Sequence, residues 1–204
     1  MQNAYLYLQK HPLSKVLLVT SEVLSPLLDP QNFDTQIIFS DGATATILCG
    51  EDHLDSCYFL VKEPILSGSG EPLDSLYVPT VNSSQNISMK GRKVFTKAVK
   101  KMASVLNQVC TRENLKVADL DLVIPHQANQ RIIDAIAKKI GSPEKVASNI
   151  KHHGNTSSSS IPIYLAENWS HLQNKNTLAL TAFGGGFTYA AAILHSLRND
   201  NSSQ

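Results

Sequence analysis

The chain has 204 residues, 42% of them hydrophobic and 17% charged, and a formal net charge of +1. This composition is typical of a globular protein with a core, and its near-neutral charge excludes the strongly basic domain expected of a nucleic-acid-binding protein. No apolar run reaches the length of about 18 residues that predicts a membrane span, and the N-terminal residues lack the pattern of a signal peptide.

The first half of the chain predicts one helix followed by strands. The helix occupies 1–9 and ends at His11-Pro12, since proline disfavours helical backbone in the residue before it. Apolar and β-branched runs predict strands at 15–23, 39–50 and 57–66. The first of these reads as buried on both faces, and Pro64 is expected to stop the third. Loops are predicted at 27–36 and 67–88.

The second half alternates helices and strands. A helix over 91–110 has apolar residues on one face and lysines on the other. Further helices are predicted at 126–141, ended by Gly141, and at 161–172. Strands are predicted at 119–125, 177–183 and 187–197. This alternation predicts an α/β fold in which helices cover both faces of a mixed sheet.

The chain has three cysteines, Cys49, Cys57 and Cys110. They form no C-x-x-C pair, so they predict neither a zinc site nor a disulfide framework. Unpaired cysteines of this kind favour a reducing compartment, and we expect the protein in the cytoplasm.

Three loops carry residues suited to chemistry: Pro125-His126-Gln127, His153-Gly154-Asn155 and Gly184-Gly185-Gly186. All lie at strand ends or at the turns leaving them, where open α/β sheets place their sites. Taken singly, each loop also has a structural explanation, because histidine can begin a helix, asparagine can cap one and glycines can form a tight turn.

Taken together, the segments VIPHQANQRIIDAIAKKIG, HGNTSSSSIP and AFGGGFTYAAAIL resemble the C-terminal part of the β-ketoacyl-acyl carrier protein synthase III family. IIFSDGATATIL and MKGRKVFTKAVKKM are similar to two more of its segments. The resemblance runs from Met1 to about Leu197. It implies a thiolase-like, layered αβαβα architecture with mixed sheets, incomplete at the N-terminus. The implied parts are the rest of an N-terminal half over 1–88, a C-terminal half over 89–197 and a tail over 198–204.

The resemblance implies an acyltransferase with a cysteine, a histidine and an asparagine in its active site. The cysteine would take an acyl group from acyl-CoA, and malonyl-acyl carrier protein would then lose carbon dioxide and attack the acyl-enzyme. His126 and Asn155 would donate hydrogen bonds to the enolate oxygen, and the N–H of Gly185 would hold the acyl-enzyme oxyanion. Phe183 would lie beside the nucleophile. No cofactor and no metal is implied.

Two positions depart from the family pattern. On the ungapped match the nucleophilic cysteine falls just upstream of Met1, and none of the three cysteines in the chain can replace it. The chain therefore reads as a fragment, and we expect no condensing activity from it alone. In addition, Phe33 stands where usual bacterial members carry an arginine that helps hold the adenine end of CoA, which leaves the acyl donor open.

The expected partners are acyl-CoA, an acyl carrier protein and a second copy of the chain in a homodimer; no nucleic acid and no membrane is expected. Six basic residues lie within 89–101, and Arg131, Lys138 and Lys139 follow on the next helix. Such a face can be merely solvated, but it also suits an acidic carrier protein. Within the family, the arginine after H-Q-A-N contributes to this surface, which points to Arg131.

Other interpretations stay open at this point. The chain is also compatible with an enzyme of secondary metabolism that makes quinolones, polyketides or acyl esters, or with a non-catalytic synthase-like subunit or decayed gene. A metal site built from His126, His152 and His153 is a further hypothesis. It lacks a dedicated ligand pattern and would leave Gly154 and Asn155 unexplained.

Overall fold

The structure is a computed structural model that describes residues 1–70, 75–79 and 86–198. The strands are β1 (Lys15–Glu22), β2 (Gly42–Cys49), β3 (Phe59–Val61), β4 (Ile65–Gly68), β5 (Leu76–Tyr77), β6 (Ser88–Met89), β7 (Leu122–Pro125), β8 (Thr177–Gly184) and β9 (Thr188–Ser196). The α-helices are α1 (Gln2–Lys10), α2 (Phe33–Gln36), α3 (Gly91–Arg112), α4 (Gln130–Ile140), α5 (Ile150–His153), α6 (Ser160–Glu167) and α7 (Trp169–Leu172). Short 3₁₀ helices are η1 (Ser25–Leu27), η2 (Glu51–Ser56), η3 (Val117–Asp119), η4 (Pro143–Lys145) and η5 (Ser157–Ser159).

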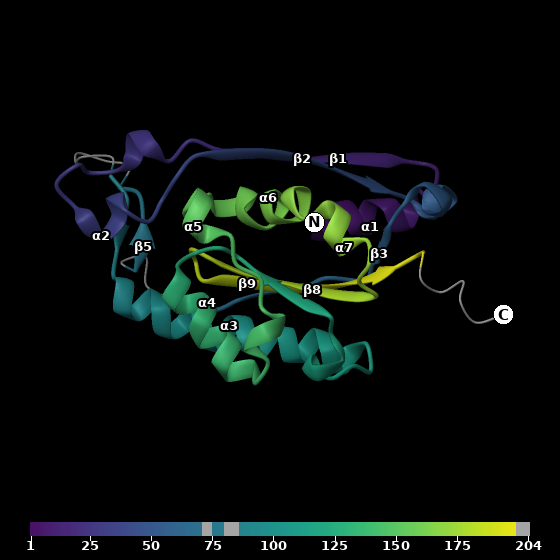
Figure 1. Cartoon of the computed structure of the whole chain (residues 1–204). Coiled ribbons are helices and arrows are strands. Elements are labelled where there is room, and N and C mark those ends of the chain that lie inside the picture. The colour runs from purple at the N-terminus through teal and green to yellow at the C-terminus, as the bar shows by residue number, and fades with distance from the viewer. Residues whose placement is uncertain (71–74, 80–85, 199–204) are drawn as a thin grey trace.

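The elements stack in layers, as Figure 1 shows. The β1–β2 pair forms one outer layer, α1, α6 and α7 lie beneath it, the sheet containing β8 and β9 comes next, and α3 and α4 form the opposite outer layer. The predicted α/β class is therefore confirmed.

The central sheet is mixed and has five strands, in the order β3-β9-β8-β7, with β4 also pairing with β9. Only the β7–β8 pair is parallel, and the other pairs are antiparallel. The third predicted strand ends before Pro64 as expected, but its range over 57–66 is wrong, because it contains two strands, β3 and β4, on either side of the proline. Proline has no N–H to give to a strand ladder, so the pairing stops there and resumes at Ile65 opposite Ala191.

Helices cover both faces of this sheet, as the sequence predicted. On one face Val105 and Val109 of α3 pack against Ala179 and Ile193. On the other face Leu178, with its alternate neighbours on β8 and β9, packs against α6 and α7. Successive residues of a strand point to opposite faces, so a strand between two helical layers is apolar throughout.

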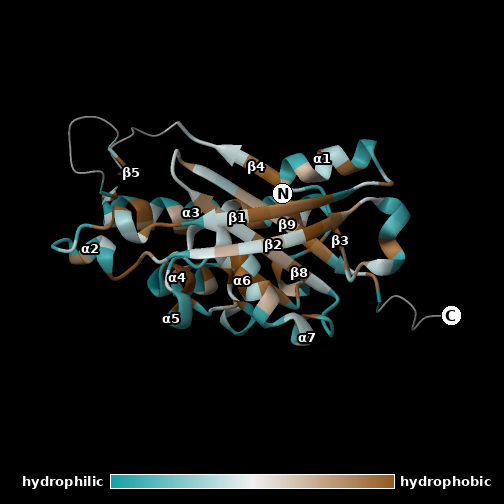
Figure 2. Cartoon of the chain, turned by 90° about the horizontal axis from the view of Figure 1, so that it is seen from above, coloured by the Kyte–Doolittle hydropathy of each residue, from teal (hydrophilic) through white to brown (hydrophobic). Residues whose placement is uncertain are grey.

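The β1–β2 pair differs from the prediction. The run 15–23 was expected to be buried on both faces, yet its side chains alternate between half-buried and exposed. Leu17, Val19 and Ile47 are 61%, 59% and 65% exposed. Figure 2 shows this apolar segment of β1 on the outside of the molecule. The prediction was wrong because apolar composition alone does not say how many layers cover a strand. Here η5 and α1 pack against β1, and α6 packs against β2, on one face of the pair.

The start of α4 also differs from the prediction. The helix begins at Gln130 rather than 126, because the side chain of Asn129 accepts a hydrogen bond of 2.9 Å from the N–H of Arg131 and caps the first turn. His126, Gln127 and Ala128 therefore form a loop between β7 and the helix. The predicted C-terminal end is confirmed, since Gly141 caps α4 with a φ of 75°.

The remaining predictions need smaller corrections. The loop expected at 27–36 contains α2, and the helix expected at 161–172 is divided into α6 and α7. Within the loop expected at 67–88, β5 and β6 form an antiparallel pair, and 71–74 and 80–85 lie outside the described residues. In the part of the chain that the structure describes, no helix has the length and apolar character needed to cross a bilayer.

Candidate functional site

The loop after β7 presents His126 in a fixed position. Its backbone N–H donates a hydrogen bond of 2.7 Å to the carbonyl of Thr181 on the neighbouring strand. The next residue, Gln127, is buried, and its side chain donates to the carbonyl of Pro125 at 2.7 Å and accepts from the N–H of Asn149 at 3.0 Å. Backbone and side-chain bonds thus hold the backbone of the loop that carries His126.

The imidazole of His126 is half-buried and neutral at neutral pH. Its Nδ1 lies 2.6 Å from the hydroxyl oxygen of Ser160 at the start of α6. Burial lowers the pKa of His126 from 6.5 to about 4, and the nearby carboxylate of Glu22 opposes this shift. A neutral imidazole can donate one hydrogen bond and accept one.

Asn155 is placed by a turn that only glycine adopts readily. Gly154 has a φ of 68° and a ψ of −160°, outside the regions open to residues with a side chain. Asn155 itself is buried, and its backbone N–H donates to the carbonyl of Ile38 at 2.8 Å. Its side-chain oxygen accepts from the N–H of Ser157 at 3.0 Å. The carboxamide is thereby oriented, and its NH₂ group is the half of the side chain left to act as a donor.

A cavity of about 250 Å³ joins several of the predicted residues. Its walls include His126, Phe183, Ser157 and Ser160. Phe183 is buried and its ring lies 4.7 Å from that of Phe187, centroid to centroid. Asn155 does not itself line the cavity, but its side chain is bonded to Ser157 in the wall. His126 and Phe183 therefore share one cavity, and Asn155 is tied to its edge.

The glycine turn between β8 and β9 lies at the same cavity. Gly184 is part of the wall, whereas Gly185, the predicted oxyanion donor, is exposed in the turn beyond it. Gly186 has a φ of 125°, which favours glycine there. The role of the Gly185 N–H stays a prediction.

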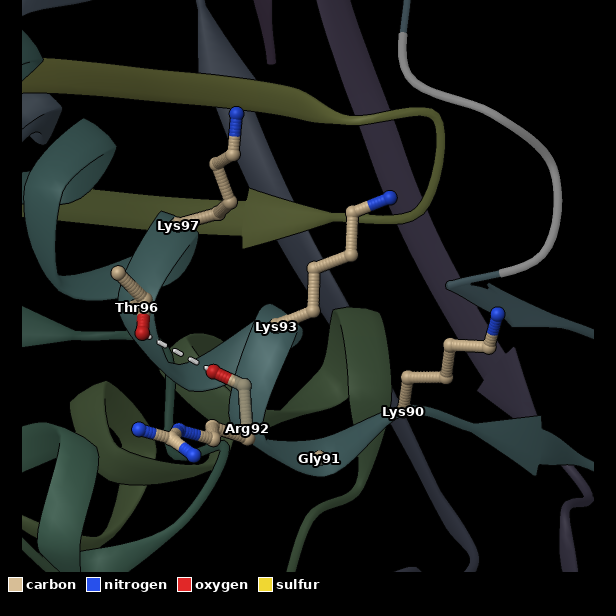
Figure 3. Close-up of a pocket in the computed structure, with 6 residues that line it drawn as sticks. All are labelled: Lys90, Gly91, Arg92, Lys93, Thr96 and Lys97. Carbon is tan, nitrogen blue, oxygen red and sulfur yellow. Dashed lines mark hydrogen bonds between the residues drawn. The ribbon is translucent and has the colours of Figure 1, made fainter.

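A second, basic groove of about 570 Å³ lies at the start of α3. It is lined by Lys90, Gly91, Arg92, Lys93, Thr96 and Lys97. Figure 3 shows Lys93 and Lys97 extending in the same direction from successive turns, while Arg92 extends to the other side. The predicted docking residues Arg131, Lys138 and Lys139 are exposed on α4, which packs beside α3. The basic residues singled out in the sequence thus lie on two helices that pack against each other, and their docking role stays a prediction.

The cysteines lie away from the His126 cavity. Cys110 lies on the core-facing side of α3, where burial raises the pKa of its thiol to about 11. Cys49 ends β2, and Cys57 follows η2, where burial and the neighbouring Cys49 raise its pKa. None of the three is among the residues that line the cavity. A thiol with a raised pKa is a poor nucleophile at neutral pH.

His153 and Phe33 are placed apart from this cavity. The Nε2 of His153 lies 2.6 Å from a carboxylate oxygen of Glu167, a contact that favours the structural role expected of this residue. Phe33 begins α2 and is 70% exposed. Among the described residues no group of three histidine, cysteine or acidic side chains could hold a metal ion.

Comparison with known families identifies the chain by two separate matches. Residues 1–59 match the 3-oxoacyl-(acyl-carrier-protein) synthase III family, and residues 110–196 match the C-terminal part of the same synthase. The chain belongs to the β-ketoacyl-acyl carrier protein synthase III family. The sequence resemblance to this family is therefore confirmed.

Individual members of the family agree with this assignment. The β-ketoacyl-acyl carrier protein synthase III of Sphingopyxis alaskensis is 40% identical over 185 residues, which cover 87% of this chain and 57% of the relative. The crystal structure of the synthase III from Aquifex aeolicus matches with a TM-score of 0.83 at 33% identity, covering 93% of this chain and 60% of that one. The crystal structure of the synthase III from Thermus thermophilus matches with a TM-score of 0.84 at 31% identity, covering 95% of this chain and 62% of that one.

These matches also confirm the predicted thiolase-like fold, of which the chain presents a part. The chain spans about three fifths of the length of the relatives it matches.

Sequence reasoning missed two residues that fix the surroundings of His126. Gln127 braces the loop that carries His126, and Ser160 bonds to the imidazole. A signal was available for each. A glutamine directly after a buried strand needs partners for its amide, and the hydroxyl run 156–160 ends at the helix that faces this loop. Which hydroxyl would reach the histidine could not be read from the run.

We expect Gly154→Ala to destabilise the chain and displace Asn155. A Cβ at this position would lie 3.1 Å from both the carbonyl oxygen of Ile38 and the hydroxyl of Ser40, in a backbone conformation strained for alanine. The expected loss is about 1–3 kcal/mol of unfolding free energy, measured by urea denaturation. Gly91→Ala is the matched control, since its Cβ would meet nothing within 4 Å. Equal unfolding midpoints for the two variants would contradict the role of this turn.

Proposed function

We propose that this chain supplies the enolate-stabilising part of an acyltransferase that condenses acyl-CoA with malonyl-acyl carrier protein, as at the start of fatty-acid synthesis. The observation that carries the proposal is a neutral imidazole, from His126, inside a cavity beside Phe183, with the Asn155 carboxamide fixed at the cavity edge. His126 and Asn155 lie on two separate loops, after β7 and after α5, and Phe183 lies near the end of β8; His126 and Phe183 line the same cavity, and Asn155 bonds to Ser157 in its wall.

The reaction needs stabilisation of one developing charge. When the malonyl thioester loses carbon dioxide, the bond between the carboxylate carbon and the α-carbon breaks, and its electron pair moves onto the thioester oxygen as an enolate. His126 and Asn155 would donate to this oxygen. The enolate carbon then attacks the acyl group held as a thioester on a cysteine, and the cysteine thiolate leaves.

Two neutral donors suit this step better than a charged group. A lysine would bind the malonyl carboxylate in the ground state, and a carboxylate would repel it. A neutral N–H interacts most strongly when charge develops on the oxygen, and each such donor is worth about 3–4 kcal/mol in oxyanion holes. The low pKa of His126 keeps its imidazole neutral, which supports this assignment.

The basic face on α3 and α4 supports a carrier protein as the second partner. Carrier proteins of this kind present an acidic helix; Arg131, Lys138 and Lys139 are exposed on α4, which packs against α3, the helix that carries the lysines drawn in Figure 3. Complementary charge speeds the encounter of such partners. Pairing with a second copy of the chain, the cytoplasmic location and the docking role of these cations belong to the same proposal.

The test is decarboxylation of a malonyl thioester by the purified chain, followed as release of labelled carbon dioxide. This half of the reaction requires the enolate donors but no acyl-enzyme. We expect release above the uncatalysed rate, and no transfer of an acyl group from acyl-CoA to the protein. No release at all would overturn the proposal, and a labelled acyl-protein would overturn the expectation that the chain alone lacks a nucleophile.

A second candidate is a non-catalytic, synthase-like subunit that works beside an active partner. The placement of all three cysteines outside the His126 cavity favours it. This candidate predicts binding of a carrier protein without release of carbon dioxide. An enzyme of secondary metabolism would keep the decarboxylation and differ in its acyl donor, to which the exposed Phe33 could contribute.

Charge reversal at Arg131 should separate the two malonyl donors. We expect Arg131→Glu to lower the rate of decarboxylation of malonyl-acyl carrier protein about tenfold at low salt. The rate of decarboxylation of malonyl-CoA should stay nearly unchanged, because the exposed cation attracts the acidic carrier protein and does not contact the small substrate. Steady-state kinetics with both donors measure this. Lys10→Glu on α1 is the control for a change of net charge alone. Equal losses with both donors, or equal effects of the two variants, would argue against docking at Arg131.

A further inference from the structure

The hydroxyl of Ser160 occupies a position between two groups of the His126 loop. Ser160 is 3% exposed, and its oxygen lies 2.6 Å from Nδ1 of His126 and 3.3 Å from the backbone nitrogen of Gln127. The three groups belong to one compact network, although 34 residues separate the serine from the histidine along the chain. The preceding residue, Ser159, bonds instead to the hydroxyl of Thr20 and to the carbonyl of Gly42.

The positions of the protons follow from the chemistry of each group. The backbone nitrogen of Gln127 can only donate, so the Ser160 oxygen accepts from it. The serine then has one proton of its own to place, and Nδ1 of His126 is the acceptor recorded for it among the described residues. If Nδ1 carried a proton instead, the oxygen would receive two donors, and its own buried proton would have no partner, which costs about 1–3 kcal/mol.

We propose that Ser160 is a positioning residue that selects the neutral tautomer of His126 with the proton on Nε2. The inference rests on the proposed function for its catalytic consequence, but the tautomer itself does not depend on any reaction. With Nδ1 engaged by Ser160, Nε2–H is the ring donor available to the cavity. An imidazole in the other tautomer would present a lone pair to an enolate oxygen and repel it.

In this arrangement Ser160 sets the tautomer of His126. Because burial holds the pKa of His126 at about 4, the ring is neutral at physiological pH and its tautomer decides whether it can donate. A serine hydroxyl suits this task since it both accepts from the fixed N–H of Gln127 and donates to the ring, whereas a carboxylate at the same place would favour the charged imidazolium.

The experiment compares Ser160→Ala, Ser160→Thr and the matched control Ser159→Ala. The tautomer is measured by ¹⁵N NMR of the imidazole at neutral pH, with the His126 signals assigned by their loss in His126→Gln. In the wild-type chain and in Ser159→Ala we expect an unprotonated Nδ1 and a protonated Nε2. In Ser160→Ala we expect a mixture of tautomers, and in Ser160→Thr, which keeps the hydroxyl, a return to the wild-type pattern.

The activity arm measures malonyl thioester decarboxylation by the same proteins. We expect Ser160→Ala to lower the rate about 10- to 100-fold, as loss of an orienting partner does elsewhere, with Ser159→Ala close to wild type. A wild-type ring protonated on Nδ1, or an unchanged tautomer in Ser160→Ala, would overturn the positioning role. If Ser160→Ala does not fold, the wild-type and Ser160→Thr spectra decide the tautomer. Should the tautomer follow Ser160 while no variant releases carbon dioxide, the positioning role stands and the proposed function fails.

Discussion

Removing the imidazole in His126→Ala should lower malonyl thioester decarboxylation about 100- to 1000-fold, the effect of losing one preorganised oxyanion donor. The donor acts only when the enolate forms, so we expect the rate constant to fall while the Michaelis constant changes little. Asn155→Asp should be at least as damaging. It keeps the shape of the side chain but replaces the NH₂ donor by an oxygen, which would repel the enolate. Release of labelled carbon dioxide measures both effects.

Two further variants test whether the loss of activity comes from the missing donors themselves. His153→Gln removes a neighbouring histidine that contacts Glu167 and lies outside the cavity lining, and it should retain wild-type activity. The double variant His126→Ala, Asn155→Ala should lose less than the product of the single losses, because both groups act on one oxygen. Near wild-type rates for either single variant would mean that the side chain does not touch the enolate.

The second large effect concerns stability at acidic pH. The pKa of His126 is lowered from 6.5 to about 4 in the folded chain by burial. Between these values the unfolded chain binds a proton on this side chain and the folded chain does not. The contribution of the neutral histidine to stability is therefore complete above about pH 6.5 and is lost as the pH falls toward 4. A shift of this size corresponds to at most about 3 kcal/mol, and partial exposure of the ring reduces it.

Urea denaturation at pH 7.5 and at pH 4.5 measures this loss. The chain has seven histidines, so the informative quantity is the difference between wild type and His126→Gln. The glutamine variant cannot take up the proton, and we expect it to lose about 1–2 kcal/mol less than wild type over this range, because the full shift would give at most about 2.5 kcal/mol and the ring is partly exposed. Ser159→Ala serves as a variant that keeps the histidine and should follow wild type. Parallel losses in wild type and His126→Gln would show that this histidine is not held neutral by the fold.

The alternation of elements was readable from the sequence because it depends on local pattern. The apolar stripe of α3, the left-handed Gly141 after α4 and the β-branched runs of β1 and β2 each carry their own signal within a few residues. Two features that the prediction lacked depend on distant neighbours. Coverage of β1 on one face only follows from which elements pack on it, and the new strand after Pro64 follows from the pairing of Ile65 with Ala191 on β9.

For the candidate site too, some features could be predicted from the sequence and others could not. The H-Q-A-N, H-G-N-T-S and G-G-G-F motifs pointed to His126, Asn155 and Phe183 as residues of one family, and Gly154 has the backbone conformation its position requires. The motifs did not reveal that Gln127 braces the loop or that Gly184, rather than Gly185, borders the cavity. Those facts depend on where the Gln127 side chain points and on how the glycine turn lies against the cavity.

By itself, the sequence determined the kinds and order of the longer elements, the family and the residue types available for chemistry, since periodicity, capping and motif spacing act over short stretches of chain. The tertiary structure alone decided which cavity receives His126, that no cysteine borders it, and which of four consecutive serines bonds to the imidazole. Hydrogen bonds act over about 3 Å, so they depend on how segments far apart in the chain are brought together by packing.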